Sequence, residues 1–140
     1  MDKFKEIRPV VLGVVKKDNK ILVSKGYDNE RKEIFYRCIG GGIKLIKKSE
    51  DALKREFEEE LNINIEVGNF LGISENIFQY KGKNAHELIL FYDVTIKNED
   101  YKSSYKLLDD DDEYEALWIE IDKFKNKENI IYPKQILNIL

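Results

Sequence analysis

Three glutamates gather on one face of a predicted helix shortly after a glycine-rich loop. Glu56, Glu59 and Glu60 follow Gly40–Gly42 in the chain. Residues three and four apart are neighbours on a helix surface, so these three side chains point the same way while Glu58 is rotated off that face. Carboxylates gathered in this way repel one another unless a hard cation lies between them, and Mg2+ prefers oxygen ligands and shares its shell with substrate phosphates. The spacing therefore predicts a magnesium site, with Mn2+ as an alternative ion.

The same helix has a second side that is suited to burial. An acidic stretch is often only a solvated face, which is the alternative to a metal site. Here the apolar positions fall at the spacing of a buried stripe, so the helix can pack with one side and present carboxylates with the other. We predict this helix over residues 50–61, with Ser49 as its N-cap. The stripe consists of Ala52, Leu53, Phe57 and Leu61.

Residues 41–63 resemble the Nudix box, the signature of hydrolases that cleave a nucleoside diphosphate linked to another group. That signature is commonly written G-x5-E-x7-R-E-U-x-E-E-x-G-U, with U an aliphatic residue. The matching positions are Gly41, Arg55, Glu56, Glu59, Glu60 and Ile63, and Phe57 stands at a U position. Further likeness to a bacterial branch of the superfamily lies in residues 35–42, 75–78, 81–83, 86–87, 118–119 and 132–133.

Two defining positions of the box depart from the pattern. Lys47 stands where a glutamate is expected and Asn62 where a glycine is expected, and Ile46 replaces a glycine common in the loop. Asparagine tolerates the left-handed conformation that ends a helix, so Asn62 is a mild change. Lys47 reverses a charge near the predicted metal site. It either weakens metal affinity or supplies a cation to a substrate phosphate.

The resemblance implies a fold and an activity. The expected fold is an α/β, Nudix-type α/β/α sandwich with a mixed central sheet, in a single domain over residues 1–140. The expected activity is a metal-dependent pyrophosphohydrolase that cleaves a nucleotide or nucleotide derivative through water attack on a phosphoanhydride. Because of Lys47 and Asn62, the alternative is a catalytically weakened Nudix module that binds a nucleotide or senses one.

Residues around the box complete the predicted site. By the resemblance Arg55 orients the glutamates, and direct contact with phosphate is its other interpretation. Arg37 is a candidate for bidentate phosphate contact, with a surface ion pair as the alternative. Gly41 and Gly42 let backbone amides approach a diphosphate. Glu87, at the start of an apolar strand, joins the substrate-binding set and is the first candidate for an additional acidic ligand. A strand-edge charge is its alternative.

Weaker candidates surround these positions. Glu75 and Glu113 are the next choices for an acidic ligand outside the box. His86 is the only histidine, so substrate contact or a structural hydrogen bond is expected of it rather than zinc binding. Aromatic side chains able either to stack a base or to fill the core are Tyr36, Phe78 and Tyr80.

Composition limits the class of protein. The chain has 140 residues and a formal charge of −3, from 27 acidic residues against 24 Lys and Arg. It therefore has length for one core and no basic surplus for a nucleic-acid polymer. Its one cysteine, Cys38, excludes an internal disulfide and fits a core position. No apolar run approaches ~18 residues and the N-terminus lacks a secretory pattern, so we predict a cytoplasmic protein without membrane contact. A homodimer stays open.

The remaining elements follow from local pattern. Residues 98–113 form a predicted polar loop that contains Asp109–Asp112, a run typical of a solvated loop. A hairpin is predicted from strands 9–15 and 21–24 around the polar turn 16–20, and Gly82 is predicted to turn a second hairpin. The other predicted strands are 33–39, 63–67, 71–80, 87–96 and 115–121, and a C-terminal helix is predicted over 131–140 with Pro133 near its first turn.

Overall fold

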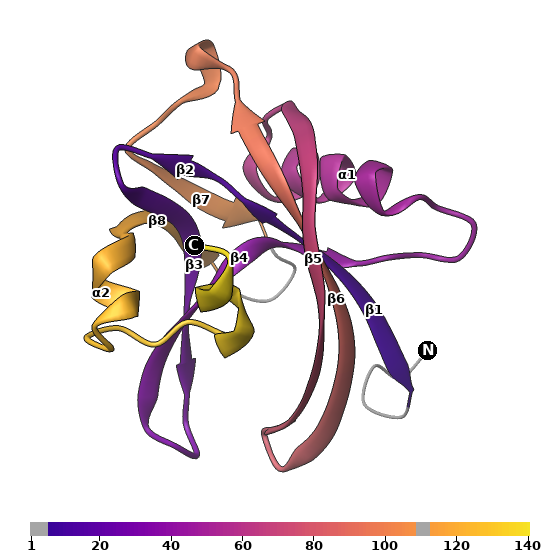
Figure 1. Cartoon of the computed structure of the whole chain (residues 1–140), viewed down its shortest axis with the longest axis vertical. Helices are drawn as coiled ribbons and strands as arrows, with labels where there is room; N and C mark the ends of the chain where they lie inside the picture. Colours follow the sequence, from indigo (N-terminus) through magenta and orange to yellow (C-terminus); the bar gives the residue numbers. More distant parts are fainter. Residues whose placement is uncertain (1–5, 109–112) are drawn as a thin grey trace.

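A mixed sheet forms the centre of the protein. The computed structural model describes residues 6–108 and 113–140, arranged as in Figure 1. Among them, strands join in the order β5-β6-β1-β4-β3-β8-β7, and β2 pairs with β3. The β1–β6 pair is parallel and the other neighbours are antiparallel. The strands are β1 (Ile7–Val14), β2 (Lys16–Lys17), β3 (Lys20–Asp28), β4 (Glu33–Gly42), β5 (Ile65–Tyr80), β6 (Lys83–Ile96), β7 (Ser104–Leu108) and β8 (Glu113–Glu120); the helices are α1 (Ser49–Leu61), α2 (Ile121–Lys125) and the 3-10 segments η1 (Asn98–Asp100) and η2 (Lys134–Asn138).

Strand β1 supplies side chains to two cores, one on each face of the sheet. Val10, Leu12 and Val14 belong to one buried cluster, and Val11 belongs to the other together with Val15, the residue after the strand. Successive side chains of a strand point to opposite faces, so an unbroken aliphatic run requires cover on both. Other segments must therefore cover both sides of this sheet.

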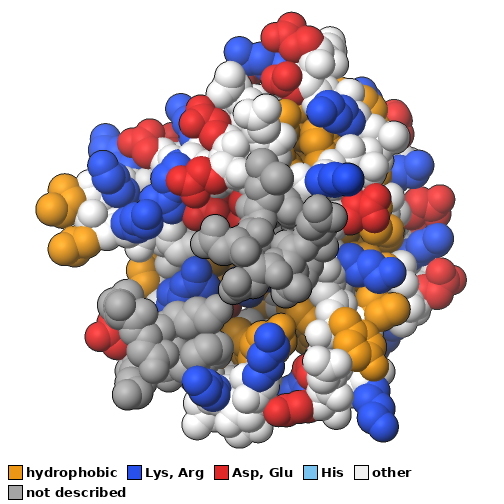
Figure 2. Space-filling model, turned by 180° about the vertical axis from the view of Figure 1, so that it is seen from behind, with side chains coloured by type: hydrophobic (Ala, Val, Ile, Leu, Met, Phe, Trp, Pro, Cys, Tyr) orange, Lys and Arg blue, Asp and Glu red, His pale blue; other side chains and the backbone are white. Residues whose placement is uncertain are grey.

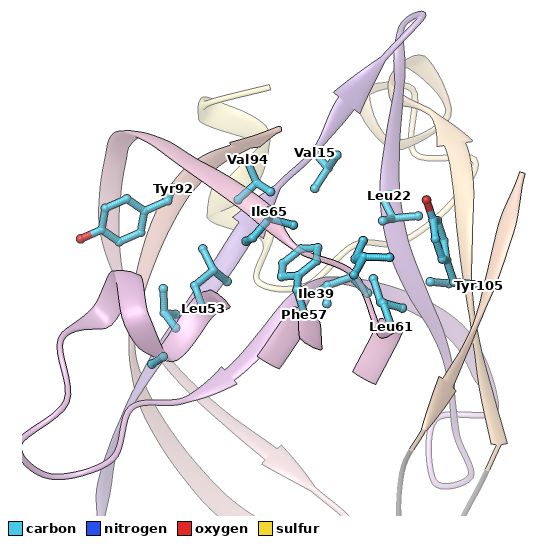
Figure 3. Packing of buried hydrophobic residues seen from close by; sticks show 14 residues of the cluster. Val15, Leu22, Ile39, Leu53, Phe57, Leu61, Ile65, Tyr92, Val94 and Tyr105 are labelled. Atoms are coloured by element: carbon cyan, nitrogen blue, oxygen red, sulfur yellow. The ribbon is translucent and has the colours of Figure 1, made fainter. Parts of the chain in front are cut away.

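Helix α1 covers the first face. Its predicted apolar stripe is confirmed, since all four of its members are buried. Figure 3 shows Leu53, Phe57 and Leu61 among buried side chains of the strands. Gly13 makes room for this packing, because a Cβ at that position would lie 3.0 Å from Cε2 of Phe57.

The C-terminal segment covers the second face. Phe124 of α2 and Ile136 of η2 are buried in the cluster that contains Val10. In Figure 1 α1 lies to one side of the sheet and α2 to the other, so the predicted α/β/α sandwich is confirmed. Helix α2 was not predicted, because five residues are too few for a helical period. The predicted helix over 131–140 is wrong in extent and type, since only a 3-10 turn follows Pro133.

The two ends of α1 are set by different residues. The predicted N-cap is wrong: Lys48 takes that position without a side-chain cap bond, and Ser49 is already helical. The Ser49 hydroxyl instead shares a hydrogen bond of 2.7 Å with the Tyr92 hydroxyl. At the other end Asn62 is left-handed, with φ 56° and ψ 40°, and its amide donates to the Glu58 carbonyl while the Ile63 amide reaches that of Phe57. Asn62 thus ends the helix as predicted.

The three glycines lie in a strand, which corrects the prediction of a loop. Gly40, Gly41 and Gly42 pair with Leu12, Val11 and Val10 of β1. A Cβ on Gly40 would lie 2.0 Å from the Val11 carbonyl oxygen. Glycine is needed here for close approach of backbones rather than for a turn, and the loop begins only after Gly42.

The predicted hairpins are correct in their turns but not in all their strands. Asp18 and Asn19, with φ 52° and 63°, turn the chain between β2 and β3. The predicted pairing of β1 with β3 is wrong, because β1 lies between β6 and β4. Its aliphatic side chains suit a strand with a neighbour on each edge. The predicted Gly82 turn between β5 and β6 is confirmed, with φ 75°.

Two further segments differ from their predictions. Strand β5 continues through residues 68–70, where a break was predicted, because register shifts absorb Gly68 and its neighbours. Strand β7 lies within the predicted polar loop 98–113 and pairs with β8. Asp109–Asp112 lies outside the described residues.

Candidate active site

A cavity of about 1120 Å³ opens where β1, β3 and β4 meet the β5–β6 hairpin, and the end of α1 and the C-terminal segment complete its wall. Most of the predicted site residues reach this cavity. Those that line it are Arg37, Gly41, Gly42, Glu56, Glu60 and Glu87. Arg55 and Glu59 lie beside them without lining it.

Arg55 joins helix α1 to strand β4. Its Nη2 donates to Glu56 Oε1 at 2.9 Å and to the Gly42 carbonyl at 3.3 Å. Its Nε lies 3.7 Å from Glu59 Oε1, too far for a hydrogen bond, and is buried without a hydrogen-bond partner among the described residues. Arg55 therefore holds Glu56 in one orientation against the strand, which is the geometry required for the predicted orienting role.

Glu56 fills space that a side chain on Gly41 would occupy. A Cβ at Gly41 would lie 2.6 Å from the carboxyl carbon of Glu56 and 2.7 Å from its Oε1. A Cβ here would displace the carboxylate, so residue 41 must be glycine for Glu56 to keep this position. The link between the two ends of the box is therefore steric as well as electrostatic.

The three carboxylates do not form a ready-made cluster. The described residues contain no group of three or more His, Cys, Asp or Glu side chains placed to hold a metal ion. Glu56 turns toward Arg55, whereas the Glu59 side chain is 61% exposed. The Arg55 guanidinium lies near both Glu56 and Glu59 and supplies the opposite charge to them, so the shared face of the three carboxylates stays a prediction.

The donor set nevertheless fits a hard divalent cation. Glu56 and Glu60 line the same cavity, and both offer carboxylate oxygens. Because Gly41 has no side chain, it does not cover the Glu56 carboxylate. A metal would be held by Glu56 and Glu60. Glu59, three residues after Glu56 on the helix, would complete the set.

Glu87 occupies a position that its sequence context did not reveal. It is 4% exposed in β6, an interior strand of the sheet, so the interpretation as a strand-edge charge is wrong. Its Oε1 accepts from Arg37 Nη2 at 2.9 Å and its Oε2 from Arg8 Nη1 at 3.4 Å. Arg37 therefore forms an ion pair, but one that lines the cavity. Arg8 was not predicted as a site residue; its signal in the sequence is a cation at the start of an aliphatic strand.

Aromatic side chains form another wall. Phe35 lies 5.8 Å from Tyr132 and 6.5 Å from Tyr80, measured between ring centroids. Burial, and then the hydrogen bond that the Tyr132 hydroxyl donates to Glu33 at 2.7 Å, raise the pKa of Tyr132. Phe35 and Tyr132 were not predicted as site residues. Phe78 also lines the cavity, so two of the three predicted aromatics reach it.

The other candidates lie elsewhere. Glu75 Oε2 and His86 Nε2 are 2.9 Å apart, away from the cavity, so His86 makes a structural contact. Tyr36 packs edge-on against Phe124 in the core. Cys38 is a core residue as predicted, and burial raises the pKa of its thiol to about 12 while Arg37 lowers it less. The side chain of Glu113 lies outside the described side chains.

The loop that joins β4 to α1 projects from the molecule. Leu45 is 90% exposed and Ile46 is 93% exposed. Figure 2 shows hydrophobic side chains beside Lys and Arg at the edge to which this loop projects. Lys47 is exposed on the same loop. No helix among the described residues combines the length and the apolar character needed to cross a membrane.

Comparison with known proteins identifies the family. The profile of the NUDIX domain matches residues 6–138. The structure resembles a MutT NUDIX hydrolase from Burkholderia pseudomallei, with a TM-score of 0.71, 19% identity, and coverage of 97% of this chain and 99% of that one. It also resembles an ADP-ribose pyrophosphatase from Streptococcus suis, with a TM-score of 0.63, 11% identity, and coverage of 96% and 89%. A UDP-X diphosphatase gives a TM-score of 0.60 at 16% identity, with coverage of 97% and 60%.

A comparison with curated protein sequences gave no significant match. The profile match spans nearly the whole chain and includes the region where Gly41, Arg55 and Glu56 meet. The chain therefore belongs to the Nudix family, whose members are hydrolases of phosphoanhydride bonds.

Proposed function

We propose that this protein is a metal-dependent pyrophosphohydrolase that cleaves a nucleoside diphosphate linked to another moiety. The observation that carries the proposal is the position of Glu56, which Arg55 holds against Gly41 at the edge of a cavity large enough for a nucleotide. An oriented carboxylate beside uncovered backbone suits an ion and a diphosphate together.

The side chains divide the work of hydrolysis. Glu56, Glu59 and Glu60 would hold Mg2+, or Mn2+ in its place, and one of these glutamates or a carboxylate from a loop would orient or deprotonate the attacking water. When bound, the ion would neutralise charge on the phosphate oxygens and favour deprotonation of the water nucleophile. Arg55 keeps Glu56 in its productive orientation, which is a positioning role.

The substrate class follows from the cavity and from the similar proteins. Aromatic side chains near Phe35 offer faces for a base or sugar. Two of the similar structures are named for ADP-ribose and UDP derivatives, which supports a nucleoside diphosphate derivative. A cytoplasmic location and a homodimer stay predictions.

The test is phosphate release, after coupled phosphatase treatment, from nucleoside triphosphates, nucleotide sugars, ADP-ribose and dinucleoside polyphosphates with Mg2+ or Mn2+. Glu56→Gln, Glu59→Gln and Glu60→Gln are each expected to lose at least about 100-fold in rate, by analogy with the removal of a group that stabilises transition-state charge. Glu58→Gln is the matched control, because its exposed side chain lies on the same helix but off the carboxylate face. Equal rates in all four variants would contradict the proposal.

One observation favours a second function. Lys47 replaces an acidic residue on the loop beside the site, and its charge opposes metal binding. If the protein is a nucleotide-binding module instead, nucleotides will raise its melting temperature while turnover stays at background with either ion.

A further inference from the structure

Glu87 lies buried between two arginines from different strands, and all three side chains line the cavity that also contains Glu56 and Glu60. We propose that Arg8 and Arg37, positioned by Glu87, bind a second phosphate group of the substrate, apart from the phosphates at the carboxylate helix. That this phosphate belongs to the substrate rests on the proposed function, whereas the anion site itself does not.

Charge is the first reason. Two guanidinium groups around one carboxylate leave a net positive charge at this wall of the cavity. Among the described residues, each guanidinium gives one N–H hydrogen to Glu87, and arginine has five such donors in a planar fork. The remaining donors match the geometry of a phosphate, which arginine binds in a bidentate manner.

Exposure is the second reason. The side chains of Arg8 and Arg37 are 32% and 28% exposed, while that of Glu87 is 5% exposed. A ligand in the cavity can therefore contact the guanidinium groups of Arg8 and Arg37 but not the carboxylate of Glu87. The Arg8 guanidinium lies close to Gly42, where a Cβ would come 3.0 Å from its Nη2, and its hydrogen bond to Glu87 holds it there. An anion site with arginines held in place loses less conformational entropy on binding.

Glu87 consequently takes a positioning role instead of the predicted one as an acidic metal ligand. Each of its two oxygens already accepts a hydrogen bond from arginine. Loss of one arginine would leave the other pair intact, whereas loss of the carboxylate would leave two cations to repel each other.

The arrangement narrows the substrate class. A nucleoside triphosphate, or a derivative with a phosphate on its second moiety, would place phosphate oxygens at both the carboxylate helix and the arginine pair. A diphosphate linked to a neutral sugar would reach only one of them. Phosphorylated substrates are therefore expected to have the lower KM.

The test uses inorganic pyrophosphate as the probe, titrated calorimetrically into the metal-free protein in the presence of EDTA. Arg8→Gln and Arg37→Gln are each expected to raise Kd about 10-fold, the effect of losing a charged hydrogen bond. Arg31→Gln is the matched control, because Arg31 lines the same cavity but pairs with Asp28, and its Kd is expected to change less than about twofold. Equal effects of all three substitutions, or no effect of the first two, would overturn the proposal.

A second variant covers the case in which a glutamine variant fails to fold. Arg37→Lys keeps the charge but loses the planar fork, so its Kd is expected to lie between those of the wild type and Arg37→Gln. A wild-type Kd in Arg37→Lys together with unchanged binding in Arg8→Gln would reject the site. Pyrophosphate binding without turnover of any substrate would reject the proposed function and leave the anion site standing. Turnover with unaltered Kd in the arginine variants would do the reverse.

Discussion

Phe57, in the helical half of the Nudix box, is fully buried, whereas Ile46, in the loop half, is 93% exposed. The helical half is fixed by core packing and by Arg55, and it keeps the arginine and the three glutamates of the family pattern. The loop departures Ile46 and Lys47, and Asn62 after the helix, lie at exposed positions. The comparison teaches that this motif changes where few atoms pack and persists where a carboxylate must be held.

The largest effect is expected from Phe57→Ala, which removes the central side chain beneath the helical half. Loss of a fully buried phenylalanine is expected to lower the free energy of unfolding by about 3–5 kcal/mol. Denaturant unfolding measures this change. Phe70→Ala, at a 53% exposed position, is the control and should change stability far less. If both variants lose equal stability, the burial of Phe57 does not stabilise the helical half more than an exposed aromatic side chain does.

Ile46→Gly is expected to stabilise the protein. Ile46 has φ 66°, a left-handed conformation that strains a β-branched residue by roughly 1–2 kcal/mol. Part of this gain is offset by the greater entropy of glycine in the unfolded chain, so a net rise of about 0.5–1 kcal/mol is expected.

The control for that substitution is Leu45→Gly. Leu45 is 90% exposed but lies outside the left-handed region, so it has no strain to relieve and should lose stability. Thermal unfolding of the two variants separates strain from exposure. A destabilised Ile46→Gly would show that the loop half depends on contacts of this side chain.

Lys47→Glu probes the charge of the loop half. Lys47 is exposed, so reversal of its charge is expected to lower the half-saturating Mg2+ concentration only about fivefold, equivalent to about 1 kcal/mol. Lys47→Gln removes the charge without adding a ligand and should give about half of that free-energy change. A much larger effect of glutamate alone would show that residue 47 enters the metal shell. An unchanged rate and metal requirement would show that the departure is silent.

The smallest effect is expected from Asn62→Gly. Asn62 already tolerates its left-handed conformation through its short polar side chain, so glycine should add only about 0.5 kcal/mol to the free energy of unfolding. Asn62→Ala should lower the free energy of unfolding, because alanine has neither the short polar side chain of asparagine nor the backbone freedom of glycine. A stability gain for alanine would contradict the conformational account of this helix end.

Local pattern was a good guide to single elements and a poor guide to their partners. The buried stripe of α1 and the turns at Asp18 and Gly82 were predictable because each depends on residues close in the chain. The predicted partner of β1 was wrong, because the aliphatic pattern of a strand does not distinguish pairing with distant β6 from pairing with nearby β3. Strand β7 was missed because it is only five residues long and lies within an otherwise polar stretch.

The site shows the same limit. The three glutamates and Arg55 lie within one helix, so their shared face followed from helical geometry. Their final orientation did not, because the Gly42 carbonyl that receives Arg55 comes from a strand. The contact between Glu87 and Arg8 joins residues 79 positions apart, and no local spacing predicts it.

The run of glycines in β4 has a consequence for folding. A strand segment without side chains carries almost no information about which residues it should face, and a slip by one position would replace one glycine by another. The register must come from the preceding residues: Ile39 is buried in the core under α1 and Cys38 in the core on the opposite face. A slip would exchange these two side chains between the two cores. The burial of Ile39 and Cys38 during assembly of the sheet therefore fixes which glycine lies beside Glu56.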